Sequence, residues 1–199
     1  MPDTVGSLPS ATAAASGGRY IYIACPWTPV GGGMYKVADY LIQSQALDTP
    51  PDAAKLRPLD TRGGGSAVAS SWVLLTALAK LVRGRISGHL AGVHVNMAER
   101  LSLVRKSVIV VACRALGIPV VLHLHAAQLH HFFRALPLLL QRLTRWVFSL
   151  PRSVVVLGAT ARRFVETERE GVRSVCIDRI NRSYLLIDAG TLAFEKIDQ

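Results

Sequence analysis

The chain has 199 residues, half of them hydrophobic, which is enough for one domain with a substantial core. Its formal net charge of +10 at pH 7 suits a nucleic acid, an anionic membrane surface or a phosphorylated small molecule. No nucleic-acid-binding motif accompanies the charge, and only 7% of the residues are aromatic, which argues against a base-stacking nucleic-acid surface.

Residues 1–18, MPDTVGSLPSATAAASGG, differ in composition from the rest of the chain. They are small, polar and rich in Pro, Gly and Ser, and they lack the basic start and apolar centre of a signal peptide, so a disordered leader is expected. No uninterrupted apolar run reaches the roughly 18–20 residues of a membrane-spanning helix. The three cysteines, Cys25, Cys113 and Cys176, are far apart and odd in number, which favours buried free thiols in a reducing cytosol.

Strand and helix patterns alternate along residues 19–170. Strands are expected at 19–25, 55–60, 91–96, 120–125 and 153–158, and helices at 34–47, 67–82, 99–117, 137–150 and 159–170. Pro58 assigns the second strand to an edge of the sheet, because proline cannot donate a hydrogen bond to a neighbouring strand. The strands are near-continuous Val, Ile and Leu runs, as in parallel sheets that are buried on both faces. The alternation predicts an α/β fold, a single Rossmann-like doubly wound parallel sheet.

Three unusual segments follow predicted strands, where ligands of open parallel sheets bind. The first, CPWTPVGGG, places Gly31, Gly32 and Gly33 before a helix, whose free N–H groups suit an anion. A flexible turn explains these glycines equally well. The second, DTRGGG, offers Arg62 to a phosphate, although a mobile loop is the alternative for Gly63–Gly65.

The third segment, HLHAAQLHH, holds four of the six histidines of the chain. Strand alternation puts His123 and His125 on one face, with His123 as a hydrogen-bonded core residue and His125 at the rim. His130 and His131 are expected at the cleft edge or in solvent. No H-E-x-x-H motif or nearby carboxylate completes a metal site, and no G-x-S-x-G motif indicates a serine hydrolase. A small metal enzyme that uses these histidines remains an alternative.

The helix expected at 137–150 carries an apolar stripe with arginines between its members. The stripe consists of Leu139, Leu143, Trp146, Val147 and Leu150, and Arg142 and Arg145 are interspersed. A stripe of this kind predicts a helix that faces the core and exposes a basic edge. Attachment to anionic lipid is the alternative, which the net charge of the chain keeps open.

Four segments in order resemble the N-terminal domain of family 4 glycosyltransferases. They are IYIACPWTPVGGGMYKVADYLI, AGVHVN, CRALGIPVVLHLHA and PRSVVVLGATARRFV, and the likeness covers roughly residues 19–170. Members of this family have the GT-B fold and transfer a sugar from a nucleotide-sugar to an acceptor. The likeness is to the exopolysaccharide-biosynthesis branch, which extends sugars on a lipid-diphosphate carrier.

The resemblance implies roles for particular residues. His125 matches the histidine that hydrogen-bonds the transferred sugar, and Gly31 and Gly32 match the glycine pair beside the donor diphosphate and the acceptor. The family retains anomeric configuration and needs no metal or other cofactor for the site. A cytoplasmic protein, peripheral on the inner face of the membrane, is then expected, with a nucleotide-sugar and a lipid-linked saccharide as its partners.

The chain departs from the family pattern after residue 170. A GT-B enzyme has a second Rossmann-like domain, with an E-x7-E glutamate pair, that holds most of the nucleotide. Residues 171–199 show neither feature and are expected to be a divergent tail, from truncation or a frameshift. The chain alone is then expected to be inactive. The alternative is a non-catalytic interaction or lipid-phosphate-binding module that works with a separate donor-domain chain.

Overall fold

The main body of the protein is a six-stranded parallel sheet with the order β2-β1-β3-β4-β5-β6. The computed structural model describes residues 18–27, 32–48, 53–125, 129–157, 159–168, 174–177, 185–187 and 192–194. The strands of the sheet are β1 Tyr20–Cys25, β2 Lys55–Asp60, β3 Leu90–Met97, β4 Val120–Leu124, β5 Ser153–Leu157 and β6 Ser174–Ile177. Two short strands, β7 Leu185–Ile187 and β8 Leu192–Phe194, pair with each other in antiparallel fashion.

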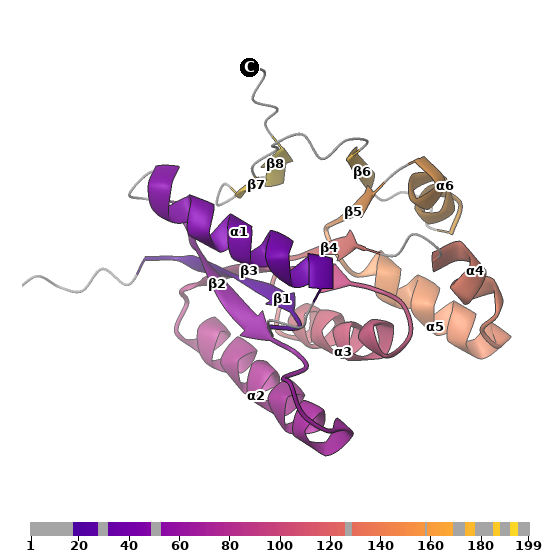
Figure 1. The fold of residues 1–199 in the computed structure, drawn as a ribbon, viewed down its shortest axis with the longest axis horizontal. Coiled ribbons are helices and arrows are strands. Elements are labelled where there is room, and N and C mark those ends of the chain that lie inside the picture. The colour runs from indigo at the N-terminus through magenta and orange to yellow at the C-terminus, as the bar shows by residue number, and fades with distance from the viewer. Residues whose placement is uncertain are drawn as a thin grey trace, which may run out of the picture.

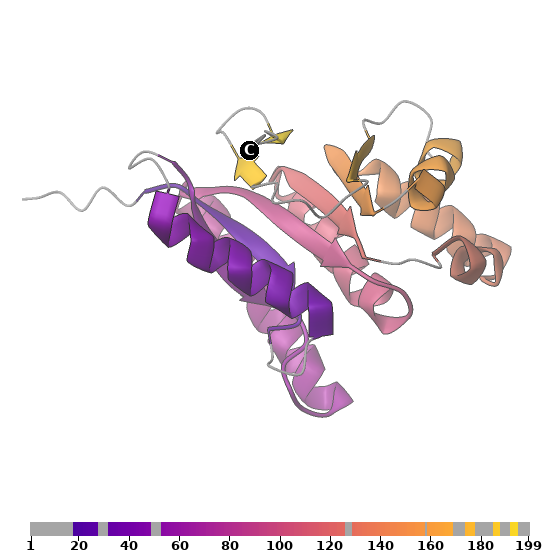
Figure 2. The same cartoon turned by 45° about the horizontal axis from the view of Figure 1, so that its top comes forward.

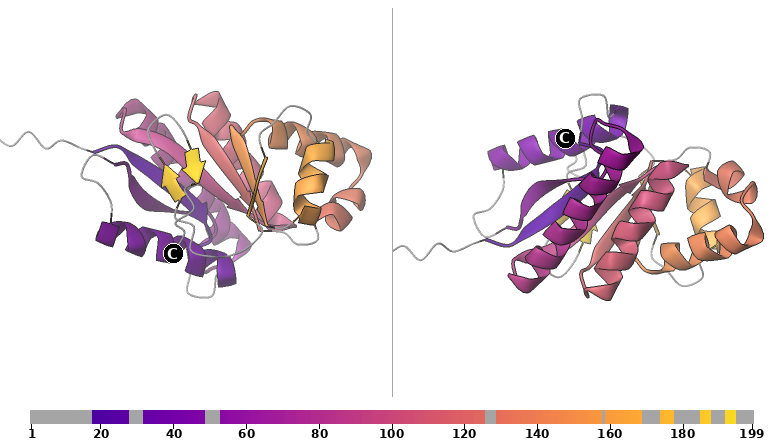
Figure 3. Two further views of the ribbon diagram at one scale, coloured as in Figure 1. Left: turned by 90° about the horizontal axis from the view of Figure 1, so that it is seen from above. Right: turned by 90° about the horizontal axis from the view of Figure 1, so that it is seen from below.

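Helices cover both faces of this sheet, as the doubly wound class requires. They are α1 Gly32–Asp48, α2 Ala67–Ile86, α3 Leu101–Ala115, α4 Leu129–Arg134, α5 Leu138–Ser149 and α6 Ala159–Glu168. Helix α1 lies over one face, beside β1 and β2 (Figure 1), and α2 lies behind the sheet when α1 faces the viewer (Figure 2). The view from below shows α2 and α3 side by side across the opposite face (Figure 3). The predicted α/β class is therefore confirmed.

The elements predicted from periodicity all have counterparts, and β2 lies at the edge of the sheet as Pro58 indicates. The helix predicted at 67–82 extends to Ile86 and ends before Gly88, whose φ of +71° favours glycine. The short helix α4 and the strand β6 were not predicted. Because β6 pairs with β5, the sheet extends beyond residue 170, the predicted end of the domain. Residues 1–17 of the predicted leader lie outside the described residues.

One face of the sheet, called here the core face, packs against α2, α3 and α5. Its residues in β3 and β4 are all apolar: Val93, Val95, Met97, Val120, Leu122 and Leu124. They are buried together with Leu81 of α2, Ile109 of α3 and Val147 of α5. Burial of apolar area on this face supplies most of the hydrophobic stabilisation of the fold.

The opposite face, called here the α1 face, has a different composition. Ile23 and Cys25 of β1 pack beneath Ala38 of α1 in a small apolar cluster. On the neighbouring strands, His94, Asn96 and His123 alternate with the core-face residues and therefore point to this side. The core face of β3 and β4 is thus apolar, whereas polar side chains are buried on their α1 face.

The orientation of α5 differs from the prediction. Leu139, Leu143 and Trp146 are 75%, 51% and 49% exposed, whereas the buried residues of the helix are Thr144, Val147 and Phe148. The exposed stripe and the buried stripe are one residue apart, which is about 100° around a helix. Periodicity alone cannot predict which of two adjacent stripes is buried. The contact between α5 and α3 buries the stripe that contains Val147 and Phe148.

Helix α2 contains no uninterrupted apolar run of membrane-spanning length, but by its length and mean hydropathy alone it could cross a membrane. Ala77 and Leu81 nevertheless pack into the main core, and Val68, Trp72 and Leu75 are exposed on its outer side. The helix therefore combines a buried stripe with an apolar outer face.

Two of the three cysteines, Cys25 and Cys113, are buried free thiols as predicted. Burial raises the pKa of each thiol to about 12, so both are protonated and unreactive near neutral pH. The side chain of Cys176 lies outside the described residues.

Candidate functional site

The carboxyl ends of the parallel strands meet at one rim of the sheet. Along this rim, β2 is followed by Arg62, β1 by Trp27 and α1, β3 by Glu99, and β4 by His125. The direction of the strand order reverses between β1 and β3, which is the position where open α/β sheets bind ligands. The predicted site residues that the structure describes therefore border one rim, on neighbouring strands.

His125 lies directly after β4 and is held by β3. Its backbone N–H donates to the carbonyl of Met97 at 2.8 Å, and its Nε2 lies 3.0 Å from Oδ1 of Asn96. Asn96 is itself buried, so this partner is fixed in position. Burial lowers the pKa of His125 to about 4, which leaves a neutral imidazole at neutral pH.

His123 lies one pleat back from His125 on the same face, as strand alternation predicts. The ring centroids of the two residues are 4.0 Å apart. His123 is hydrogen-bonded, as predicted, and its partner is a third histidine. Its Nδ1 lies 3.3 Å from Nε2 of His94. Burial, with a smaller contribution from His125, lowers the pKa of His94 to about 4 and that of His123 to about 2.

His94 was not singled out from the sequence, although strand alternation contains the signal. It lies two residues before Asn96 in the apolar run LAGVHVNM, so both side chains fall on one face of β3. The sequence does not reveal that this face adjoins His123, because that contact depends on the pairing of β3 with β4. Among the described residues, no group of three or more His, Cys, Asp or Glu side chains has the arrangement of a metal site.

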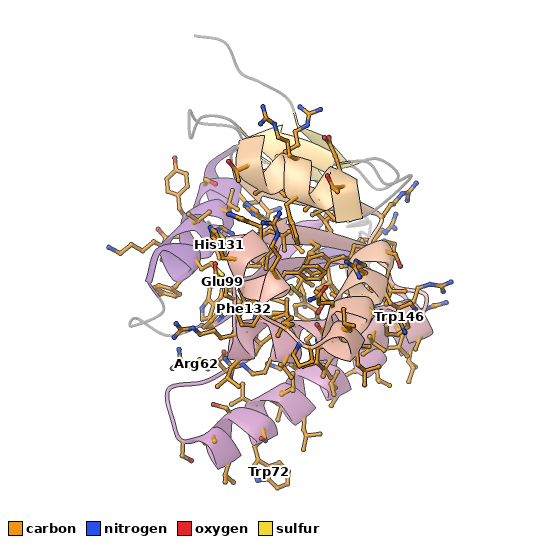
Figure 4. The ribbon with its side chains drawn as sticks, turned by 90° about the vertical axis from the view of Figure 1, so that its right-hand side faces the viewer. Arg62, Trp72, Glu99, His131, Phe132 and Trp146 are labelled. Atoms are coloured by element: carbon orange, nitrogen blue, oxygen red, sulfur yellow. The ribbon has the colours of Figure 1, made fainter. Side chains whose placement is uncertain are left out.

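The other two histidines of the predicted cluster lie on α4. The ring centroids of His130 and His131 are 4.1 Å apart, with the planes tilted by 41°; His130 is half-buried and His131 is exposed. Figure 4 shows His131 together with Glu99 and Phe132, on the side of the molecule away from Trp72. Glu99 is a half-buried carboxylate two residues after β3, a rim residue that the sequence analysis did not include.

The first glycine segment is open to solvent at the start of α1. Gly31 lies outside the described residues. Gly32 begins the helix with a φ of +66°, and a Cβ atom added at Gly32 or Gly33 would meet nothing within 4 Å. The ring of Trp27, after β1, packs edge-on against Tyr35 of α1 at 5.5 Å. Backbone conformation explains Gly32, and the space above this helical turn is free.

The second glycine segment has a structural explanation. The Asp60 carboxylate accepts backbone hydrogen bonds from Trp27 at 3.1 Å, Arg62 at 2.9 Å and Gly63 at 3.1 Å. Burial alone would raise the pKa of Asp60, but these donors lower it below its usual value. A Cβ atom on Gly63, whose φ is +65°, would lie 2.9 Å from Val73. The backbone donors of this loop therefore hold the protein's own carboxylate, and the glycine permits packing against α2.

Arg62 itself is exposed, and its charge contributes to lowering the pKa of Arg105, after burial, which has the larger effect. The two guanidinium groups thus form a positive region at the β2 end of the rim. Lys106 lies behind them, buried to 1% exposure, and its Nζ donates to Oγ1 of Thr61. Burial lowers the pKa of Lys106 to about 7. Lys106 lies on the buried stripe of α3 with Leu103, and this helical spacing is the sequence signal by which its burial could have been predicted.

The turn from β3 into α3 contains backbone strain. Arg100 has a φ of +59°, although residues with side chains rarely adopt the left-handed region. Oγ of Ser102 accepts a hydrogen bond from the Ala98 N–H at 3.2 Å, which closes the same turn. Strained residues of this kind concentrate at functional sites, and this one borders the reversal in strand order.

Comparisons of the chain with family models, curated proteins and solved structures found no match. The chemistry that this rim can perform is therefore inferred from the residues of the rim alone. The β4 end offers a neutral, fixed imidazole, and the β2 end offers exposed positive charge. Between them lies the open start of α1.

Proposed function

We propose that the sheet is the acceptor-side half of a retaining glycosyltransferase that transfers a sugar from a nucleotide-sugar to a lipid-linked saccharide. The observation that supports this proposal most directly is the neutral His125 imidazole, held by Asn96 at the rim. A fixed hydrogen-bonding group in this position can orient a sugar and stabilise charge that develops during transfer. A nucleotide-binding domain, in the same or a separate chain, supplies the remainder of the site and closes over it.

The spacing of the rim groups suits an elongated, partly anionic ligand. β2 and β4 are separated by β1 and β3, and neighbouring strands lie about 4.8 Å apart, so Arg62 and His125 follow strands about 14 Å apart. One sugar ring does not reach both ends. A diphosphate-linked sugar spans this distance. Its diphosphate would lie near Arg62 and the open start of α1, and its sugar would lie near His125.

The test is calorimetric binding of UDP-, GDP- and dTDP-sugars, each compared with the corresponding nucleoside diphosphate. The expected result is a sugar-dependent gain in affinity that His125→Ala abolishes, whereas Arg62→Ala weakens nucleotide and nucleotide-sugar equally. His131→Ala, on exposed α4, is the matched control and should bind as the unmodified protein does. Equal binding of nucleotide-sugars by His125→Ala and the unmodified chain, or no binding of any of them, would contradict the proposal.

A second candidate function is a non-catalytic lipid-phosphate-binding module that works with a separate donor-domain chain. The observation in its favour is the apolar outer surface of α2 and α5, where Trp72 and Trp146 point away from the sheet (Figure 4). Arg142, between the exposed Leu139 and Leu143, adds the positive charge that an anionic bilayer attracts. In both candidate functions we propose a peripheral position on the inner face of the cytoplasmic membrane, and this surface supports the membrane contact.

Vesicle co-sedimentation tests this surface and separates the two functions. Binding is expected to phosphatidylglycerol vesicles and not to phosphatidylcholine vesicles, and to weaken at least fivefold in Trp146→Ser, with Ser149→Ala as the matched control on α5. Binding to vesicles without any nucleotide-sugar binding would favour the second function. Equal binding to both kinds of vesicle, or none, would exclude a surface that binds anionic lipid.

A further inference from the structure

Two buried ring nitrogens on the α1 face, Nδ1 of His94 and Nε2 of His123, have no hydrogen-bond partner among the described residues. They are the outer nitrogens of the histidine pair, whose inner nitrogens lie 3.3 Å apart. The two residues are only 3% and 8% exposed. Nearly all buried polar atoms in proteins are hydrogen-bonded, so two such atoms in one pair indicate an additional partner.

Proton counting shows what that partner must offer. A neutral imidazole carries one N–H donor and one acceptor nitrogen. When Nε2 of His94 donates to Nδ1 of His123, the outer nitrogen of His94 is an acceptor and that of His123 is a donor. The opposite tautomers exchange these two roles. In both cases the pair presents one free donor and one free acceptor.

His125 adds a second acceptor to this group. Because Oδ1 of Asn96 accepts, Nε2 of His125 carries the proton and its Nδ1 is left with a lone pair. The rings of His123 and His125, which lie in contact with their planes tilted by 38°, connect the buried pair to the rim. Hydroxyl groups both donate and accept, so they can satisfy all of these nitrogens. A phosphate near neutral pH can also keep an O–H, but its negative charge would be buried here without a counter-charge, which is costly.

We propose that His94, His123 and His125, with Asn96 as a positioning residue, form a subsite that binds a neutral, hydroxyl-bearing group and discriminates against anions. The inference rests on the proposed function in taking this group to be a sugar. Burial keeps the pKa of each histidine at about 4 or below, so the rings carry no charge near pH 7 that would attract a phosphate. The exposed positive charge of Arg62 lies at the other end of the rim, after β2.

The direct test is NMR of the full chain labelled with 15N-histidine, at pH 7.5. Methyl glycosides of glucose, galactose and mannose are titrated, and inorganic phosphate is added separately at equal concentration. At least one glycoside should shift the 15N resonances of His94 and His123, whereas phosphate should not. His130 and His131 serve as internal controls and should not respond. A response to phosphate as large as that to the glycosides, or no response to any glycoside, overturns the proposal.

Variants test the contribution of each residue. His123→Gln and Asn96→Leu should each weaken glycoside binding at least tenfold, whereas His131→Gln should leave it unchanged. A variant that does not fold is set aside, because the measurement on the unmodified chain decides the question. Glycoside binding that persists unchanged in folded His123→Gln would overturn the subsite.

The two proposals fail in different ways. If nucleotide-sugar binding depends on His125 but no glycoside shifts the His94 and His123 resonances, the subsite is wrong and the proposed function stands. If the glycosides shift these resonances but no nucleotide-sugar binds, the subsite stands and the proposed function fails.

Discussion

The two faces of the sheet differ most sharply at Leu122 and His123, neighbours in β4. Leu122 points into the main core between the sheet and helices α2, α3 and α5. His123 points to the α1 face, where its ring contacts two other histidines. A single strand thus contributes to apolar packing on one side and to a polar, incompletely hydrogen-bonded group on the other. The core face accounts for stability, and the α1 face holds the groups available for chemistry.

Leu122→Ala should have the largest effect on stability, because it opens a cavity in the core face. Removing a fully buried leucine side chain costs about 2–5 kcal/mol of the free energy of unfolding. Urea denaturation followed by circular dichroism measures this difference. Leu143→Ala, on the exposed side of α5, is the control and should change stability by no more than about 0.5 kcal/mol. Similar losses in both variants would contradict the assignment of the core face.

Lys106 is an exception within the buried stripe of α3, and it should make stability depend on pH. Its pKa is about 7 in the folded protein and about 10.5 when unfolded, so between these values the unfolded chain binds more protons. The free energy of unfolding should therefore rise with pH from about 7 to 8.5, by up to about 1.4 kcal/mol per pH unit, below the range in which the raised pKa values of the buried Cys25 and Cys113 thiols act in the opposite direction. Urea denaturation across this range should show the rise, and Lys106→Met should remove it. The same slope in Lys106→Met would exclude Lys106 as its origin.

Asp60→Ala should have an intermediate effect, because it removes the acceptor for backbone groups after both β1 and β2. We expect a loss of about 1–2 kcal/mol, limited by the partial exposure of the carboxylate. Thermal unfolding measures the loss. Asp39→Ala on α1 is the matched control, since Asp39 accepts a single i,i+4 bond from Gln43, worth about 0.5 kcal/mol or less. Equal losses of stability in the two variants would show that the three backbone hydrogen bonds to Asp60 contribute no more than the single bond from Gln43 to Asp39.

Joint replacement of His94 and His123 by leucine should have the smallest effect at pH 7.5, within about 1 kcal/mol. Removing both partners also removes both unpaired nitrogens, whereas His123→Leu alone leaves His94 buried without its partner and should cost more. Urea denaturation of the single and double variants makes the comparison. A double variant less stable than the single one would show that the pair contributes net stability, which would weaken the contrast between the faces.

Lowering the pH should destabilise the protein through the buried histidines of the α1 face. Burial lowers the pKa of His94 from about 6.5 to about 4, so between these values the unfolded chain binds protons that the folded chain does not. Stability should therefore fall as the pH decreases from about 6.5 to 4. The double leucine variant should lose less stability over this range than the unmodified protein, as thermal unfolding at each pH would show.

Local patterns in the sequence determined most of the fold. Apolar runs of strand length, helical periodicity and the proline of β2 are properties of neighbouring residues, so the alternation and the edge strand could be predicted. The alternation of His123 and His125 was predictable for the same reason. The short α4 and β6 lack a strong local signal, and β6 depends on its pairing with β5.

The tertiary structure alone decided which distant residues meet. His94 and His123 are 29 residues apart, Trp27 and Asp60 are 33 apart, and Thr61 and Lys106 are 45 apart. These contacts depend on which strands are neighbours and in what register, and on which stripe of a helix faces them. Composition and periodicity describe each element by itself. The polar group on the α1 face exists only because β3 and β4 lie side by side in a register that brings Asn96 opposite His123.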